Sequence, residues 1–390
     1  FVIIEGNCQS NKTDITEYKR TRWSFETNGS IHGSPSVSGG NIFVGSEDST
    51  LYSLNKKTGK LNWKYKTEGP IYSTPSISGN TIFCTSMDGS LYALDKNTGT
   101  LKWKFKSVKD HQHDIWDYHN CSPLVSENFV YFGSGNGTFY AIDKDTGKKV
   151  WNYQTEGAIH TTPIVNNNII YFGNFAGYFY ALNKNTGNEK WIFNTIGQRW
   201  FPKGAIQQGA TFHNDILYFG SRDFNIYAIN AKTGRGMWNM YEQGSWIIAS
   251  PVVKDSLLLF GTSDTHSFYA LDNRSGRIIW RKKINMNIFG QCEVGEKLVY
   301  FGALNGKLYA LNLLNGNIMW EFQTEESKIG WNKVFNKNNE ISKSFMDEYG
   351  SNGDQFYGQI YTLGSIVSKP LLEDGILYFS SMNGKLYALE

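Results

Sequence analysis

A thirteen-residue segment recurs along the whole chain, and this repeat limits the possible folds more than any other feature. Its clearest copy is LYALDKNTGTLKW at residues 91–103. An incomplete copy, LYALE, stands at residues 386–390, and the other complete copies are residues 51–63, 139–151, 179–191, 226–238, 268–280 and 308–320. Because repeated units pack against their neighbours, a repeat that spans the chain predicts one structural body rather than several domains.

Each repeating unit has the pattern of a small antiparallel sheet. Residues 34–37, 41–46 and 51–54 are short runs rich in β-branched and aromatic residues, separated by turn residues, and a further run surrounds Trp63. Four such runs predict a four-stranded meander. The link before the last run ends in Gly59 and fits a turn closed by a glycine with positive φ. Eight meanders arranged radially bury their faces against each other, so we predict an all-β, eight-bladed propeller.

The two ends of the chain complement one another. The copy at residues 386–390 lacks the last strand of its unit, whereas the strand around Trp23 has no preceding hairpin. We therefore predict that the N-terminal strand closes the ring by pairing with residues 386–389, which removes the exposed edge of the last blade. Residues 20–390 would form this single domain, preceded by a tether at residues 1–19.

A tryptophan lies in the last strand of each unit and is expected to dock between blades: Trp23, Trp63, Trp103, Trp151, Trp191, Trp238, Trp280 and Trp320. With the motif A-x-D/N-x-x-T/S-G-x-x-x-W, as at residues 93–103, they resemble the repeats of the pyrroloquinoline-quinone (PQQ) propeller superfamily. Two branches matter, the quinoprotein alcohol dehydrogenases and the BamB-type outer-membrane assembly lipoproteins, which are eight-bladed and non-catalytic. The chain is most similar to the second, in size and in ending on the last blade's inner hairpin.

Cys8 has a sequence context of its own. It follows the apolar residues 1–4 and precedes the polar residues 9–13, and the stretch resembles a bacterial lipoprotein processing site with Cys8 as the acylated residue. Glu5 and Asn7 depart from that motif, and a frayed N-terminus is the alternative reading. Lipidation would place the protein in the periplasm or at the cell surface after export, anchored to the outer membrane.

Composition and charge exclude several classes of protein. The formal net charge is only +3, with Lys and Arg spread among Asp and Glu, so no basic face for nucleic acid is expected. No apolar run is long enough to span a bilayer. Cys84 lies in an apolar strand and is predicted to be a buried thiol, and its spacing from Cys121 and Cys292 indicates neither a metal site nor a disulfide. We expect a monomer that meets a membrane only through a lipid anchor.

Three insertions interrupt the repeat, and they are the main functional signal beyond the fold. They lie near residues 107–118, 196–204 and 325–363, each between the tryptophan strand of one unit and the first strand of the next. This common position places all three on one face of the ring. Loops at one end of a propeller carry function because its strands are used for packing. Loop drift on an unconstrained surface is the alternative.

The first insertion is rich in histidine and aspartate. His111 and His113, with Asp114 or Asp117, have the imidazole and carboxylate groups that bind transition metals. No fourth ligand is visible, and the spacing matches no structural zinc site. We therefore predict no metal here, and expect a polar loop whose side chains are hydrogen-bonded locally or to solvent.

The first strands of the units offer a ring of candidate binding residues, three positions before the recurring proline or its equivalent. Five consecutive blades present polar groups and three present apolar ones: His32, Tyr72, Asn120, His160, Gln207, Ile248, Phe289 and Val367. Such a funnel would hold a polar ligand or peptide, or else form ordinary channel lining. Neighbouring loops add cationic and aromatic groups near its mouth: Arg199, Trp200, Lys203 and Trp331.

An enzymatic function needs motifs that the sequence does not supply. The quinoprotein dehydrogenases resemble this chain in repeat but carry adjacent disulfide-bonded cysteines and a Ca²⁺ site of Glu, Asn and Asp, and neither motif is matched. We expect no cofactor, and a non-catalytic envelope protein that binds or scaffolds a polypeptide, by resemblance the barrel-assembly machinery. The alternatives are a PQQ- and Ca²⁺-dependent oxidoreductase and a propeller that binds a small ligand or a carbohydrate.

Overall fold

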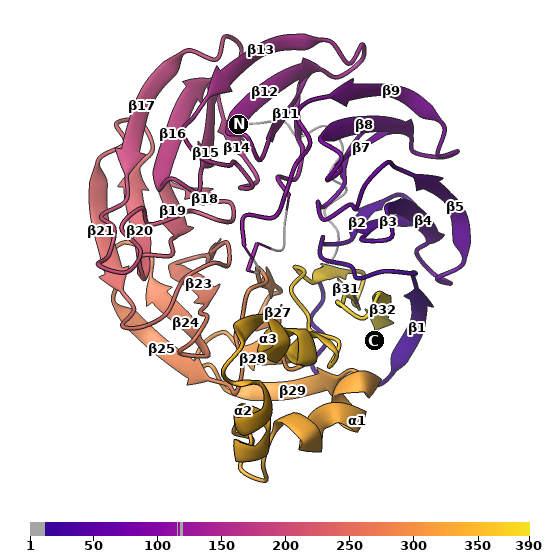
Figure 1. The fold of residues 1–390 in the computed structure, drawn as a ribbon, viewed down its shortest axis with the longest axis vertical. Coiled ribbons are helices and arrows are strands. Elements are labelled where there is room, and N and C mark those ends of the chain that lie inside the picture. Colours follow the sequence, from indigo (N-terminus) through magenta and orange to yellow (C-terminus); the bar gives the residue numbers. More distant parts are fainter. Residues whose placement is uncertain (1–11, 115, 118–119) are drawn as a thin grey trace.

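Eight four-stranded antiparallel sheets form a ring around a central axis (Figure 1). The computed structural model describes residues 12–114, 116–117 and 120–390. Each sheet is a meander in which strands neighbouring in sequence pair with one another, apart from the sheet that joins the two ends of the chain. The predicted eight-bladed propeller is confirmed.

The first four blades take up the chain from Ser36 to Asn194. Their strands are β2 (Ser36–Ser38), β3 (Asn41–Ser46), β4 (Thr50–Asn55) and β5 (Leu61–Lys66); β6 (Ser76–Ser78), β7 (Thr81–Thr85), β8 (Ser90–Asp95) and β9 (Leu101–Lys106); β10 (Leu124–Ser126), β11 (Phe129–Gly133), β12 (Thr138–Asp143) and β13 (Lys149–Gln154); and β14 (Ile164–Asn166), β15 (Ile169–Gly173), β16 (Tyr178–Asn183) and β17 (Glu189–Asn194). In each blade the second and third strands are almost wholly buried and carry the core.

The last four blades include the ring closure and the helices. Their strands are β18 (Thr211–His213), β19 (Ile216–Gly220), β20 (Asn225–Asn230) and β21 (Gly236–Tyr241); β22 (Val252–Lys254), β23 (Leu257–Gly261), β24 (Ser267–Asp272) and β25 (Ile278–Lys283); β26 (Glu293–Val294), β27 (Leu298–Gly302), β28 (Lys307–Asn312) and β29 (Ile318–Gln323); and β30 (Leu371–Glu373), β31 (Ile376–Ser380), β32 (Lys385–Leu389) and β1 (Thr21–Glu26). Between β29 and β30 lie α1 (Glu325–Val334), α2 (Lys343–Tyr349) and α3 (Gly353–Tyr361). No helix in the described part of the chain is long and apolar enough to cross a bilayer.

The repeated tryptophan joins each blade to the next, as predicted. The indole N–H of Trp63, for example, donates to the carbonyl oxygen of Lys96 in the following blade at 3.0 Å. Its ring lies against Gly99, which has a φ of +73°. A Cβ on that glycine would lie 2.6 Å from the indole, so the position requires glycine for its backbone conformation and for the space it leaves.

Strand β1 completes the eighth blade. It pairs antiparallel with β32, with Trp23 opposite Ala388 and Phe25 opposite Leu386. The indole N–H of Trp23 then donates to the carbonyl of Lys56 in blade one at 3.1 Å, so this seam has the same hydrogen bond as the others. The predicted closure by the N-terminal strand is confirmed.

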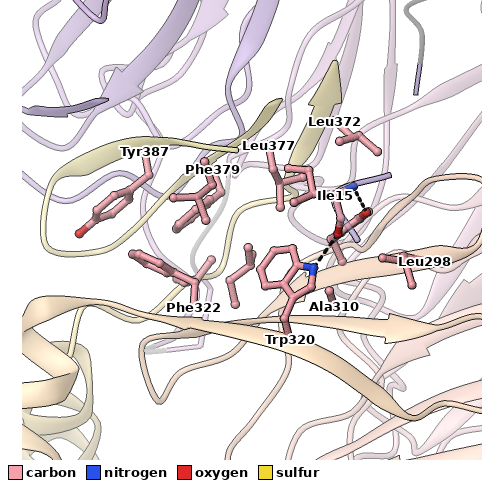
Figure 2. Close-up of a cluster of buried hydrophobic side chains, with 13 residues drawn as sticks. Ile15, Leu298, Ala310, Trp320, Phe322, Leu372, Leu377, Phe379 and Tyr387 are labelled. Carbon is pink, nitrogen blue, oxygen red and sulfur yellow. Dashed lines mark hydrogen bonds between the residues drawn. The ribbon is translucent and has the colours of Figure 1, made fainter. Parts of the chain in front are cut away.

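The seam between blades seven and eight uses a segment that the repeat does not contain. In blade eight β32 pairs with β1, and Ile15 binds Trp320 where the other seams have the turn between the third and fourth strands (Figure 2). The carbonyl oxygen of Ile15 accepts from the indole of Trp320 at 2.6 Å, and its N–H donates to the hydroxyl of Tyr300 at 2.9 Å. Just before it, Lys12 pairs with the buried carboxylate of Glu293 at 2.6 Å. The described part of the tether, residues 12–19, thus packs on the ring.

The described cysteines behave as buried thiols. Cys84, Cys121 and Cys292 are free and buried, and burial raises the pKa of each to about 12. A thiol with so high a pKa is a poor nucleophile at neutral pH. The prediction for Cys84 is confirmed, whereas Cys8 and its predicted lipidation lie outside the described residues.

Candidate functional site on the insertion face

The three insertions form one layer over the ring. Trp116, in the loop before β10, packs edge-on against Tyr357 of α3 with ring centroids 3.9 Å apart. Trp246, in the loop before β22, contacts both Trp116 and Phe201 of the loop before β18, at centroid distances of 6.1 and 5.0 Å. The loop that precedes blade three therefore reaches across the ring to contact blades five and six and the helices.

A buried histidine lies between two carboxylates beneath this layer. The imidazole of His160 is 2.8 Å from Asp117 through Nδ1 and 3.1 Å from Asp110 through Nε2. All three residues are at most 8% exposed. The amide of Asn120 donates to the second oxygen of Asp110 at 2.9 Å. Two acids supplied by the insertion thus bind two members of the predicted ring.

Electrostatics favours the charged forms of His160 and Asp110. Burial alone would lower the pKa of His160, but the charges and hydrogen bonds of Asp117 and Asp110 outweigh it and raise the pKa to about 10. Burial acts in the opposite direction on Asp110, and the hydrogen bond and charge of His160 hold the pKa of that carboxyl below its ordinary value. At neutral pH His160 is therefore an imidazolium held by Asp110 and Asp117, which suits a structural clamp and not a free general base.

A second charged pair fixes the same insertion to blade five. The guanidinium of Arg222, only 6% exposed, forms a two-pronged ion pair with Asp114, with an Nη2–Oδ1 distance of 3.1 Å. It also donates to Gln207 at 2.6 and 3.0 Å. Its flat group lies 4.8 Å from the ring centre of Trp246 and 5.2 Å from that of Phe175. Burial raises the pKa of Asp114, yet Arg222 outweighs this and lowers it.

Helices cover the apolar part of the ring. Ile248, Phe289 and Val367 are at most 3% exposed and belong to one cluster with Phe345 of α2 and Ile360 of α3. Figure 1 draws α3 over β27 and β28, and Leu304, in the turn between these strands, belongs to the same cluster. The helical insertion therefore packs on the three apolar ring positions.

Blades one and two hold the remaining ring residues. His32 and Tyr72 are 4% and 8% exposed, and their rings are tilted by 41° with centroids 4.4 Å apart. The Tyr72 hydroxyl donates to Glu47 at 3.4 Å, and His32 lies 4.0 Å from the same carboxylate. All eight ring positions are buried, so the ring forms the floor of the insertion layer.

The loop at residues 196–204 is rigid and presents apolar side chains to solvent. Gln198 and Phe201 exchange backbone hydrogen bonds at 3.1 and 3.0 Å, and the Gln198 side chain accepts from the N–H of Trp200 at 2.6 Å. Trp200 is 71% exposed and Ile196 70%. Arg199 lies against Trp200, with its guanidinium 5.1 Å from the ring centre. An exposed tryptophan on a fixed turn is a typical centre of a protein–protein contact.

The other predicted residues have varied surroundings. Lys203 is exposed at the end of the same loop. Trp331 stacks on Phe335 at 4.3 Å, so it serves the packing of α1. His113 packs on Phe175 at 4.6 Å, and His111 is exposed. Among the described residues no group of three or more His, Cys, Asp or Glu is arranged to hold a metal ion.

A central cavity of about 400 Å³ lies at the first strands of the blades. Its wall carries many hydroxyl and amide groups, and Asn120 and His160 belong to it. Several of these hydroxyls already join neighbouring blades: the N–H of Ser34 donates to Thr74, and that of Thr74 donates to Ser122, each at 2.9 Å. The channel wall thus contributes to the cohesion of the ring.

Sequence reasoning missed the residues that bind the insertions to the ring. Arg222 and Trp246 stand in loops of ordinary length, and nothing in their spacing marks them. Phe224 offered a weak signal, because five other blades have glycine at its position: Gly89, Gly137, Gly177, Gly306 and Gly384. It has a φ of +72°, unusual for an aromatic residue, and packs 5.6 Å from Phe201. That strain supports the exposed loop.

Comparisons with known proteins agree with this architecture. The profile of the family described as outer membrane protein assembly factor BamB matches residues 16–115, 115–245 and 222–338. No curated protein matches the chain.

Solved structures of similar fold include BamB from Moraxella catarrhalis, at a TM-score of 0.71 and 16% identity over 95% of this chain and 99% of that one. A europium-containing methanol dehydrogenase gives 0.72 and 14% over 98% and 94%. The quinohemoprotein alcohol dehydrogenase from Comamonas testosteroni gives 0.72 and 12% over 98% and 77%. At such low sequence identities these similarities show a common fold, and they do not show a common function.

Proposed function

Since this chain belongs to the family of the outer-membrane protein assembly factor BamB, we propose that it is a non-catalytic scaffold of the cell envelope. In this proposal it binds a polypeptide through the insertion face, and the partner is a component of the machinery that assembles outer-membrane β-barrels. Lipid attachment at Cys8 would hold it at the membrane.

The exposed loop at residues 196–204 carries the proposal. Its internal hydrogen bonds fix the backbone before any partner arrives, so little conformational entropy is lost on binding. Trp200 and Ile196 offer apolar area, and Arg199 offers a charge beside it. Tryptophan and arginine are the residue types most often found at energetic centres of interfaces.

The filled centre of the insertion face supports a scaffold over an oxidoreductase. Trp116 and Tyr357 pack together over the ring, and the acids beneath are bound by His160 and Arg222. A carboxylated quinone with Ca²⁺ needs free carboxylates and an open slot for a flat ring. The ion pairs of Asp110, Asp114 and Asp117 therefore support a scaffold over a quinone-dependent enzyme.

Affinity capture from envelope extract tests the proposal. The chain of residues 1–390 should enrich barrel-assembly proteins identified by mass spectrometry, and Trp200→Ser should reduce that enrichment at least tenfold, as expected for a central interface tryptophan. Val150→Ser is the matched control, because Val150 is exposed on the outer strand β13, away from the insertions. Equal capture by the parent and Trp200→Ser would contradict the proposal.

The similarity in fold to two dehydrogenases favours a second candidate, a quinone-dependent oxidoreductase. Adding PQQ with Ca²⁺ should leave the melting temperature unchanged and give no dye-linked alcohol oxidation if the protein is a scaffold. A saturable rise in melting temperature together with turnover would replace the first proposal by the second.

A further inference from the structure

The face opposite the insertions has a sector with its own chemistry. This turn face consists of the turns between the first and second strands of each blade and between the third and fourth. On its outer rim, blade six presents Ile278 and Ile279, 49% and 43% exposed. Blade seven continues it with Leu314 and Met319, 85% and 51% exposed. Blades six and seven, which are neighbours in the ring, thus expose four large apolar side chains on this rim.

Arginines accompany these apolar residues. Arg274 and Arg277 stand in the turn just before Ile278, and both are exposed. Within the described chain neither takes part in any of the ion pairs that the structure contains. Asp272, in the same turn, is close enough for the charge of Arg277 to help lower its pKa, so the two arginines outnumber the acid beside them. Apolar side chains beside an excess of cations form the pattern with which peripheral proteins bind anionic bilayers.

On the turn face, positive charges predominate in the outer turns and negative charges in the inner turns. In the outer turns of blades one to seven, the acids are the exposed Asp145 and the half-buried Asp95, Asp143 and Asp272. Seven cations are exposed there, of which Lys232 is paired with Asp215: Lys57, Lys60, Lys148, Lys232, Arg235, Arg274 and Arg277. Acidic residues lie mainly in the inner turns, where lysines neutralise four of them: Glu127, Asp215, Asp255 and Asp374. The outer rim is therefore positive, and blades six and seven add the largest apolar area to it.

The described chain begins beside this sector. Asp14 accepts from the N–H of Lys297 at 2.6 Å, in the inner turn of blade seven, and Lys12 pairs with Glu293 of β26. Cys8 stands four residues before Lys12. Four extended residues span at most about 14 Å. A lipid on Cys8 would hold the rim of blade seven close to the bilayer surface.

We infer that the rim formed by Arg274, Arg277, Ile278, Ile279, Leu314 and Met319 docks on an anionic lipid bilayer. The apolar side chains insert at the headgroup boundary, and the arginines bind lipid phosphates. The insertion face then points away from the membrane, toward the compartment from which a polypeptide partner approaches.

Co-sedimentation with vesicles tests this docking directly. The chain of residues 1–390 with Cys8→Ser, which cannot be lipidated, should sediment with vesicles of phosphatidylglycerol and phosphatidylethanolamine but not with phosphatidylcholine vesicles. Replacing both arginines by serine should weaken binding by roughly 30-fold, at about 1 kcal/mol for each cation. Failure to bind the anionic vesicles would overturn the inference.

Blade one supplies a matched control. Lys57 and Lys60 occupy the same turn positions as Arg274 and Arg277, but Asn62 stands where blade six has Ile279. The double variant Lys57→Ser/Lys60→Ser should retain most of the binding. An equal loss in both double variants would mean that the whole turn face attracts anions without a docking sector, and the inference would fail.

A fluorescent label locates the contact. In the Cys8→Ser background the other three cysteines are buried, so a cysteine introduced at Leu314 can be labelled selectively with an environment-sensitive dye. Its emission should shift to the blue on adding anionic vesicles, whereas a label at Lys57→Cys should not shift. A shift at position 57 alone would contradict the docking geometry. These tests use lipid only, so their result is independent of polypeptide capture by the insertion face.

Discussion

The blade seams and the insertion layer hold the same protein together in different ways. At a seam, one indole hydrogen bond and one tryptophan–glycine contact recur, as in Trp63 with Gly99. The insertion layer repeats nothing: each of its contacts, such as Arg222 with Asp114, occurs once. The seams are apolar and local to neighbouring blades, whereas the layer joins distant blades through buried charges. A substitution at a seam should therefore destabilise the protein by filling the space beside a tryptophan. A substitution in the layer should destabilise it by breaking a buried ion pair, to an extent that depends on pH where the pair includes a histidine.

Removing residues 1–24 should have the largest effect, because it damages two seams at once. It deletes the Ile15 carbonyl that binds Trp320, and it deletes Trp23 with much of β1. Trp23 is partly buried, and losing a fully buried tryptophan costs about 3–5 kcal/mol, whereas an ordinary domain has only about 5–15 kcal/mol of stability. A thermal melt should show a severely lowered midpoint. Deletion of the undescribed residues 1–11 alone is the control, and a truncated chain that melts like the parent would refute closure by this strand.

The clamp around His160 should give the next largest effect, and that effect should depend on pH. The pKa of His160 is raised from 6.5 to about 10, so its stabilisation is complete below about pH 6.5 and is lost as the pH rises through about 10. Asp117→Asn leaves the buried imidazolium with one carboxylate, which should cost about 3 kcal/mol at pH 6. By pH 10.5 the difference in unfolding free energy between parent and variant should nearly vanish.

Asp114→Asn is the control for that prediction. Its partner Arg222 stays charged throughout this range, so the effect of Asp114→Asn should be the same at pH 6 and pH 10.5. Denaturant unfolding at both pH values measures the two differences. If the cost of Asp117→Asn does not change with pH, His160 is not the titrating group.

Alanine substitutions at two glycines distinguish the cost of backbone strain from the cost of a steric clash at a seam. Gly276 has a φ of +71°, and a Cβ there would lie 2.7 Å from the indole of Trp238. Gly39 has a similar φ of +61° with nothing within 4 Å of that Cβ. Gly276→Ala should destabilise by about 3 kcal/mol, and Gly39→Ala by only about 1 kcal/mol. Equal losses in thermal or denaturant unfolding would assign the whole effect to the backbone.

The same contrast explains how far sequence reasoning reached. The tryptophan–glycine contact recurs at every seam except the one that uses Ile15, so the repeat predicted the blade number, the docking tryptophans and the closure at Trp23. The contact made by the segment assigned as a tether, residues 1–19, could not be predicted. Ile15 accepts the indole hydrogen bond of Trp320 through its backbone carbonyl, a group that every residue has. Spacing carries no information about such a contact.

The location of the insertion layer was predictable from the sequence, but the contacts within it were not. The common position of the insertions predicted one face, and Trp116, Phe201 and Tyr357 do meet there through direct or shared contacts. The ring residues lie in the segments before the first strands, and their burial was not foreseen, since it depends on an insertion folding back over them. Arg222 binds Asp114 across 108 positions of sequence, which no local pattern records.

The contact between Trp116 and Tyr357 should give the smallest effect and the sharpest test of the layer. The rings meet edge-on at 3.9 Å, and they are the direct link between the loop before blade three and the helices. Single substitutions, Trp116→Leu and Tyr357→Leu, each remove packing area besides the contact, so only the double-mutant cycle isolates it. The coupling energy from denaturant unfolding should be about 1 kcal/mol, typical of an aromatic pair. Tyr65 and Tyr92, a ring pair at 6.0 Å across a seam, provide the comparison cycle, with a smaller coupling expected from the longer separation. A coupling energy near zero between Trp116 and Tyr357 would mean that each insertion is held by its own blade. The insertions would then not form one cooperative layer.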